Sequence, residues 1–171
     1  SGAGVAFSRN PWTGENDLLV DFRFGGQGED VVSGDREAMT QEELRQVMPD
    51  VYAELTRICH RLEQHFSDMQ DIEFTVQEGK LFLLQSRAGK RAPFAALRIA
   101  VDLAEEGIIS QQQAVRLLDG IDLDAIEIHT LASTAEPVGR GTSASGGIVA
   151  GTIALTPDRA TADAGTGPVI L

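Results

Sequence analysis

The sequence predicts a mixed α+β fold, and three stretches carry that prediction. Residues 71–86 have the pattern of a β-hairpin, because two runs with alternating apolar positions flank a turn that contains Gly79. Residues 50–66 have the pattern of an amphipathic helix, with apolar side chains at spacings of four, three, four and four. A second helix is expected from Pro93 to about Glu105, since proline suits a first helical turn and Gly107 suits the residue after the last.

Two strands are expected before the first helix, at residues 4–8 and 17–24. Asn-Pro and Thr-Gly pairs within residues 9–15 predict a turn between them, so the strands should form an antiparallel pair. Alternation places four apolar side chains on one face of the second strand: Leu18, Val20, Phe22 and Phe24. Residues 25–28 then predict a turn, because the Gly-Lys-Ser/Thr of a P-loop is missing.

The helical region should begin with a short helix at Thr40, where a capping box ends at Glu43. Pro49 then starts the long helix. Its predicted core-facing stripe consists of Val51, Leu55, Ile58, Leu62 and Phe66. Cys59 lies beside the stripe and is interpreted as a buried structural thiol. His60 and His65 are five residues apart, a spacing that does not favour a metal site on a helix.

The region after the hairpin is predicted to be mainly helical, without chemistry of its own. The helix from Pro93 should bury Leu97, Ala100, Val101 and Ala104. Ser110 caps a second helix to about Leu118, and residues 122–127 form one further turn at most. Beyond a loop of small residues at 142–147, we expect a strand at 148–155, a short helix capped by Thr156 and ending near Ala164, and a strand from 167.

The hairpin has one face that could bind a metal and phosphate. A three-residue loop, residues 77–79, would keep Ile72, Phe74, Val76, Phe82 and Leu84 on one face, and Gly79 suits its left-handed third position. The opposite face would then collect Asp71, Glu73 and Gln85, with Arg87 just beyond. Mg²⁺ takes oxygen ligands and arginine pairs with phosphate, so this face could hold both. An ordinary solvated sheet face with charged residues is the alternative.

Composition limits the classes of partner. The net charge of −12 argues against nucleic acid, which requires a basic patch. No apolar run approaches the roughly 20 residues that span a bilayer, and the start lacks the pattern of a signal peptide. The single cysteine excludes an internal disulfide, so the expected location is the cytoplasm.

Several motifs resemble the pyruvate, phosphate dikinase family. The strongest are Phe66-x-Asp-Met-Gln-Asp-Ile-Glu-Phe-Thr75 and Glu78-Gly-Lys-Leu-Phe-x-Leu-Gln-x-Arg-x-Gly-Lys-Arg91. Upstream of these, the similar stretches are Ser1-Gly-x-Gly-Val-Ala-Phe-x-Arg-Asn-Pro-x-Thr-Gly-Glu15, Gln27-Gly-Glu-Asp-Val-Val32 and Met48-Pro-Asp50. Downstream, residues 147–155 resemble the opening of the family's swivelling domain. The motifs occur in the family's order, and the resemblance covers nearly the whole chain.

The resemblance implies three regions. Residues 1–91 should be the C-terminal part of an ATP-grasp nucleotide-binding domain, and residues 92–135 a helical linker. Residues 136–171 should be the start of a β-rich swivelling domain. In the family that domain carries a phosphorylated histidine within Thr-Ser-His-Ala, a motif that this sequence lacks. His129 has different neighbours and is not interpreted as that histidine, so we expect a fragment without a catalytic residue of its own and inactive alone.

The resemblance also assigns a site and a reaction. Asp71, Glu73 and Gln85 match nucleotide and metal ligands, with Glu73 and Gln85 holding Mg²⁺, and Arg87 matches a supporting arginine. Gln27 to Asp30 would lie toward the same site. The parent enzyme would use ATP and Mg²⁺ to phosphorylate a histidine and pass the phosphoryl group to pyruvate, forming phosphoenolpyruvate. Its partners would be ATP or AMP, phosphate and pyruvate or phosphoenolpyruvate, and it would be a homodimer.

Two alternatives remain open. A phosphoenolpyruvate synthase shares the fold and much of the site, and differs in using water rather than phosphate as the second phosphoryl acceptor. A stand-alone regulatory or binding module without catalysis belongs to a different class.

Overall fold

The structure is a computed structural model of the 171-residue chain. It describes residues 1–25, 39–127, 131–132, 135–139 and 148–171. The chain divides into two compact units, Ser1–Ile126 and Glu127–Leu171, and each is described by itself. The expectations for Gln27 to Asp30, for His129 and for the 142–147 loop lie outside the described residues.

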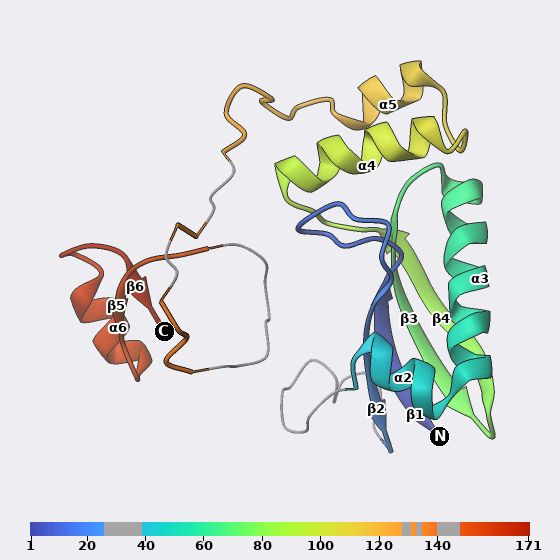
Figure 1. The fold of residues 1–171 in the computed structure, drawn as a ribbon, viewed down its shortest axis with the longest axis horizontal. Coiled ribbons are helices and arrows are strands. Elements are labelled where there is room, and N and C mark those ends of the chain that lie inside the picture. Colours follow the sequence, from blue (N-terminus) through green and yellow to red (C-terminus); the bar gives the residue numbers. More distant parts are fainter. Residues whose placement is uncertain (26–38, 128–130, 133–134, 140–147) are drawn as a thin grey trace. The chain divides into compact units, whose positions relative to one another are not determined.

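The first unit contains a four-stranded antiparallel sheet (Figure 1). Its strands are β1 (Gly2–Phe7), β2 (Leu19–Phe24), β3 (Gln70–Gln77) and β4 (Lys80–Ala88). Their order in the sheet is β2-β1-β3-β4, so the first strand lies in the middle and the hairpin forms one side. Both the predicted N-terminal pair and the predicted hairpin are confirmed.

Helices α2 (Gln41–Val47) and α3 (Pro49–Phe66) cover one face of the sheet. Thr40 and Glu43 form the predicted capping box, and Pro49 lies in the first turn of α3. The buried residues of α3 follow a spacing of four throughout: Val51, Leu55, Cys59 and Glu63. The predicted stripe was therefore wrong at its end, since Phe66 is 52% exposed. The helix instead turns Glu63 inward, where this carboxylate binds a buried arginine.

An aromatic stack over a glycine organises the core. Gly4 of the central strand pairs with Phe22 on one side and Phe74 on the other. The two buried rings meet above it, with centroids 5.8 Å apart and planes 13° apart. A Cβ atom on Gly4 would lie 2.8 Å from Phe74 Cζ, so the stack needs a residue without a side chain at this position.

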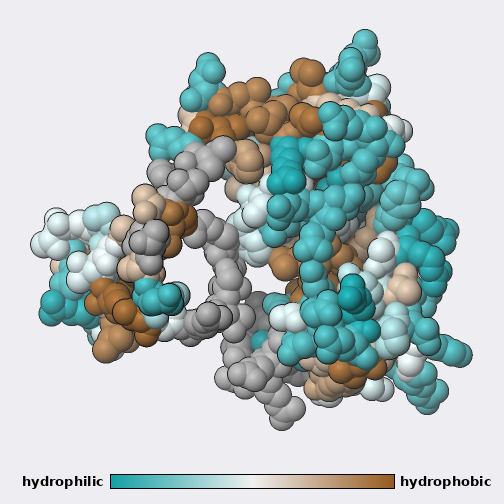
Figure 2. All heavy atoms as spheres, in the orientation of Figure 1, coloured by the Kyte–Doolittle hydropathy of each residue, from teal (hydrophilic) through white to brown (hydrophobic). Residues whose placement is uncertain are grey.

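Helices α4 (Pro93–Glu105) and α5 (Gln111–Leu117) form a helical hairpin in the same unit. Ser110 caps α5 as predicted, and Gly107 follows α4 with a φ of 74°. The predicted buried face of α4 was right at Ala100 and wrong at Val101, which is 45% exposed, and the larger Ile99 and Leu103 occupy the core instead. Hydrophobic residues also lie on the surface over α4, at the top of Figure 2.

The second unit contains a small β-α-β arrangement. The strands β5 (Thr152–Ile153) and β6 (Val169–Ile170) pair in parallel, and α6 (Pro157–Asp163) connects them. Thr156 caps α6 as predicted, whereas the strand expected over 148–155 is only two residues long. No helix in the described part of either unit is long and apolar enough to cross a membrane.

Candidate functional site

The open face of the four-stranded sheet brings the four predicted site residues together. Glu73 lies directly opposite Gln85, and Asp71 lies directly opposite Arg87. Side chains at paired positions point to the same face, and the intervening Ile72 is fully buried on the helix-covered side. The polar set therefore lies on the face away from α3, as the sequence predicts.

The hairpin reaches this arrangement by a different route from the one predicted. Its loop has two residues, Glu78 and Gly79, since Gln77 pairs with Lys80. Their φ angles of 50° and 75° are those of a type I′ turn, which matches the twist of the flanking strands. The predicted three-residue loop was wrong.

A bulge on β4 returns Gln85 and Arg87 to the sheet face from which the two-residue loop would otherwise remove them. Phe74 pairs with Leu83 and Glu73 pairs with Gln85, so Leu84 is the extra residue between them. The short loop pairs Phe82 with Thr75 on the face away from the core, and Leu84 is the bulge residue, so these side chains are 48% and 59% exposed. The bulge brings Gln85 opposite Glu73.

Asp71 and Arg87 form an ion pair in this structure. Asp71 Oδ2 accepts a hydrogen bond from Arg87 Nε at 2.8 Å and lies 2.7 Å from Arg87 Nη2 in the ion pair. The hydrogen bond to Asp71, followed by the charges of Asp71 and Glu73, raises the pKa of Arg87 above its ordinary value. The arginine side chain is 63% exposed, so its outer surface is accessible to a phosphate group while it holds Asp71.

The strand pairing adds a residue that sequence reasoning missed. Val5 of β1 is opposite Asp21 of β2 on one side and Glu73 of β3 on the other. Asp21, Glu73 and Gln85 therefore lie in one row across the sheet, all on the open face. The alternation of residues 17–24 already placed Asp21 opposite its apolar neighbours. What the sequence did not reveal was that β1 lies between β2 and the hairpin.

These side chains suit a hard cation that is shared with a ligand. They offer carboxylate and amide oxygens, which Mg²⁺ prefers, and Mg²⁺ usually keeps waters and binds substrate phosphates through one or two carboxylates. Among the described residues, no three His, Cys, Asp or Glu side chains converge as a preformed metal cage. The donor set therefore fits Mg²⁺ bound together with a polyphosphate.

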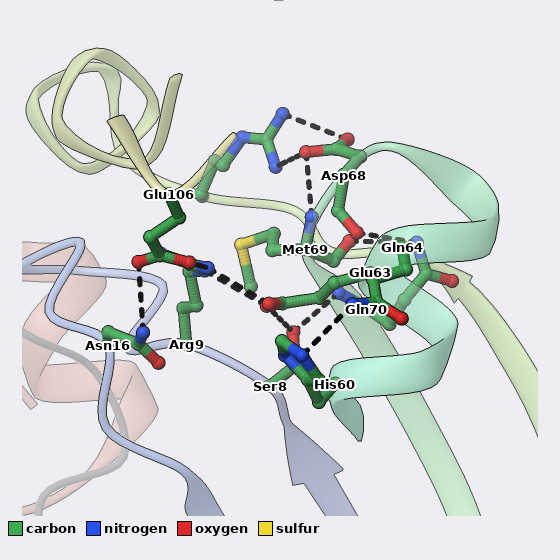
Figure 3. Close-up of polar contacts among 11 residues, drawn as sticks. Ser8, Arg9, Asn16, His60, Glu63, Gln64, Asp68, Met69, Gln70 and Glu106 are labelled. Carbon is green, nitrogen blue, oxygen red and sulfur yellow. Dashed lines mark hydrogen bonds and ion pairs between the residues drawn. The ribbon is translucent and has the colours of Figure 1, made fainter. Parts of the chain in front are cut away.

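A second polar cluster lies in the interior of the first unit (Figure 3). Arg9 is fully buried at the end of β1, although the sequence predicts a turn there. Its Nη2 donates to Glu63 Oε2 at 2.9 Å and to Glu106 Oε2 at 2.6 Å. Glu63 lies on α3 and Glu106 is the C-cap of α4, so one guanidinium joins β1, α3 and α4.

The same cluster continues toward the hairpin. Ser8 Oγ donates to Glu63 Oε1 at 2.6 Å and accepts from the backbone N–H of Gln70 at 2.9 Å. Gln70 in turn accepts from Ser86 Oγ at 2.7 Å. These polar groups are joined by internal hydrogen bonds, so the cluster links β1, α3, α4 and the hairpin.

Electrostatics in this cluster follow its geometry. Burial lowers the pKa of Arg9, but the hydrogen bonds to Glu106 and Glu63 outweigh it and the net shift is upward. The hydrogen bond from Arg9 holds the pKa of Glu106 below its ordinary value.

Burial raises the pKa of the Cys59 thiol to about 12, so this thiol stays protonated near neutral pH. The interpretation of Cys59 as a buried thiol is confirmed.

Comparisons with known proteins match the chain to one enzyme family. A family model described as the pyruvate phosphate dikinase AMP/ATP-binding domain matches residues 35–107, which include the whole hairpin. Among curated proteins, the Rhizobium meliloti (strain 1021) pyruvate, phosphate dikinase is 44% identical over 94% of this chain and 19% of the relative. The chain is homologous to part of the pyruvate, phosphate dikinases.

Two further pyruvate, phosphate dikinases show the same coverage. The Clostridium symbiosum protein is 44% identical over 95% of this chain and 19% of its own length. The chloroplastic pyruvate, phosphate dikinase 1 of Arabidopsis thaliana is 42% identical over 95% of this chain and 17% of its own length. The chain thus spans about a fifth of the length of the curated pyruvate, phosphate dikinases that it matches.

Proposed function

We propose that the open sheet face of this chain supplies metal and nucleotide ligands in a pyruvate, phosphate dikinase. The observation that supports this most directly is the row formed by Glu73 and Gln85, with Asp71 and Arg87 as the adjacent pair. All four of these residues lie inside the stretch that matches an AMP/ATP-binding domain.

Each residue has a distinct part in this proposal. Glu73 and Gln85 offer oxygens to Mg²⁺, which would neutralise and orient the phosphates of ATP. Asp71 positions Arg87 and helps to orient the nucleotide. Arg87 stabilises charge on the transferred phosphoryl group, because its guanidinium remains largely exposed. Asp21 extends the row and would contact the nucleotide or the waters on the metal.

The complete enzyme would phosphorylate a histidine with ATP and then pass that phosphoryl group to pyruvate. In the region boundaries that we propose, residues 1–91 are part of an ATP-grasp domain, 92–135 a helical linker and 136–171 the start of a swivelling domain. The names of the relatives favour phosphate over water as the second acceptor, and hence a dikinase over a phosphoenolpyruvate synthase. In this proposal the complete enzyme is a homodimer in the cytoplasm, and the segment is inactive by itself.

A chimera tests the proposed function. This chain would replace the matching 19% of the Clostridium symbiosum relative, and phosphoenolpyruvate formation from pyruvate, phosphate and ATP would be measured. We expect the chimera to be active and Glu73→Gln to lower kcat by at least about 100-fold, the scale of losing an electrostatic transition-state contact.

Glu105→Gln, on the exposed end of α4, is the matched control and should leave the rate unchanged. A Glu73→Gln chimera that phosphorylates its histidine from labelled ATP at the normal rate would disprove the assignment of Glu73.

A further inference from the structure

A groove between α3 and β4 lies on the other side of the sheet from the proposed nucleotide face. Its volume is about 560 Å³, and its lining residues are Ile58, Arg61, Leu62, Gln64, His65 and Leu83. Leu83 pairs with the buried Phe74 and therefore points to the helix-covered side. Helix α3 buries Cys59 and Glu63, so its neighbouring residues Ile58, Leu62 and His65 line the groove beside β4.

The floor of the groove is apolar and incompletely covered. Ile58 and Leu62 are only half-buried, and Leu83 is 42% exposed. The adjacent β4 is nine residues long and is at the end of the sheet, with no further strand on its outer side among the described residues. An exposed apolar edge strand offers unpaired backbone N–H and C=O groups to another polypeptide.

The rim of the groove is basic. From Arg57 to Phe66, the basic side chains on the groove side are Arg61 and His65, which line the groove, and the exposed Arg57, one helical turn before Arg61. Glu63 is the carboxylate in this stretch, and it is 3% exposed and bound to Arg9. The chain as a whole has a net charge of −12, so the basic side of α3 has the opposite sign to the protein overall.

We propose that this groove binds an extended, acidic segment of a partner protein. The segment would add a strand to the edge of β4, with alternate aliphatic side chains on Leu83, Ile58 and Leu62. Its carboxylates would face Arg61 and the other basic side chains of α3.

A defined peptide tests the proposal. The probe is a fluorescently labelled peptide of alternating valine and glutamate, the matched control peptide has lysine in place of glutamate, and both are titrated with the 171-residue chain at low salt. We expect the glutamate peptide to bind and to perturb the NMR amide signals of β4, while the lysine peptide binds at least about tenfold more weakly.

Variants locate the site. Leu83→Glu should weaken binding about tenfold, and Arg61→Glu about threefold to tenfold. Arg116→Glu makes the same charge change on the exposed face of α5 and should have no effect. Circular dichroism verifies that each variant is folded.

Three results would overturn the proposal. Equal binding of the two peptides, or none by either, would exclude recognition of an acidic strand. Binding that Leu83→Glu does not change would place the site elsewhere. Dimerisation of the free chain in sedimentation equilibrium that Leu83→Glu abolishes would assign the groove to a second copy.

Discussion

Arg9 holds two carboxylates together in the interior of the first unit. It binds Glu63 through Nε at 3.0 Å and Nη2 at 2.9 Å, and its other contacts go to Glu106. Removing Arg9 would leave the buried carboxylate of Glu63 without its charged partner in the protein interior. The cost of such a change therefore exceeds that of breaking an ion pair on the surface.

We expect Arg9→Met to lower the free energy of unfolding by about 3–5 kcal/mol, because Glu63 would be buried without its partner. Arg45→Met is the control, since Arg45 is 61% exposed and its contact with Glu42 is 3.6 Å long. That change should cost less than about 1 kcal/mol. Urea unfolding followed by circular dichroism measures both free energies of unfolding. Equal losses would show that the buried ion pairs stabilise the fold no more than a surface pair does.

At the residue scale, the sequence predicts the proposed site better than this buried cluster. Alternation along two strands, together with an assumed loop of three residues, placed Asp71, Glu73, Gln85 and Arg87 on one face. Arg9 follows an Asn-Pro turn pattern in the sequence, and nothing near it indicates that Glu63 and Glu106 fold back onto it. Contacts between residues 54 and 97 positions apart depend on the tertiary arrangement, which local patterns do not encode.

At the scale of elements, two local devices determine which side chains face the ligand side of the sheet. The two-residue turn at Glu78 and Gly79 shifts the pairing by one, and the bulge at Leu84 shifts it back. The sequence predicted the final face of Gln85 with the wrong loop, because a single loop residue and a bulge residue have the same effect on parity. Phe82 and Leu84 distinguish the two arrangements. Phe82 lies between the turn and the bulge, Leu84 is the bulge residue, and both are exposed.

The stack of Phe22 and Phe74 depends on a glycine in the central strand. Gly4→Ala would bring a methyl group to 2.8 Å from both Asp21 O and Phe74 Cζ. We expect a loss of about 1–3 kcal/mol in stability, the usual cost of overpacking a core. Thermal unfolding measures it, with Gly165→Ala as the control because no atom lies within 4 Å of that position.

A Gly4→Ala variant as stable as the parent would show that the two rings can separate without cost.

The helix boundaries follow from local chemistry. Thr40, Pro49, Ser110 and Thr156 begin helices as their sequence positions predict.

At the scale of the whole molecule, net charge opposes the proposed ligand. The chain has 26 acidic and 14 basic residues, and the proposed face adds carboxylates from Asp21, Asp71 and Glu73. A polyphosphate would approach this face only together with Mg²⁺. The nearby guanidinium of Arg87 is already paired with Asp71. We therefore expect the chain by itself to bind Mg·ATP with a Kd above about 1 mM, which corresponds to only about 4 kcal/mol.

In the proposed function, metal and nucleotide meet on the open face of the sheet, at Glu73 and Gln85. The most direct measurement is paramagnetic broadening of backbone amide signals by Mn·ATP, which locates even a weak site in the isolated chain. We expect the signals of Asp71, Glu73 and Gln85 to broaden first and Glu73→Gln to remove the effect, while Glu105→Gln should not. Broadening that is uniform, or that is strongest elsewhere and insensitive to Glu73→Gln, would contradict it.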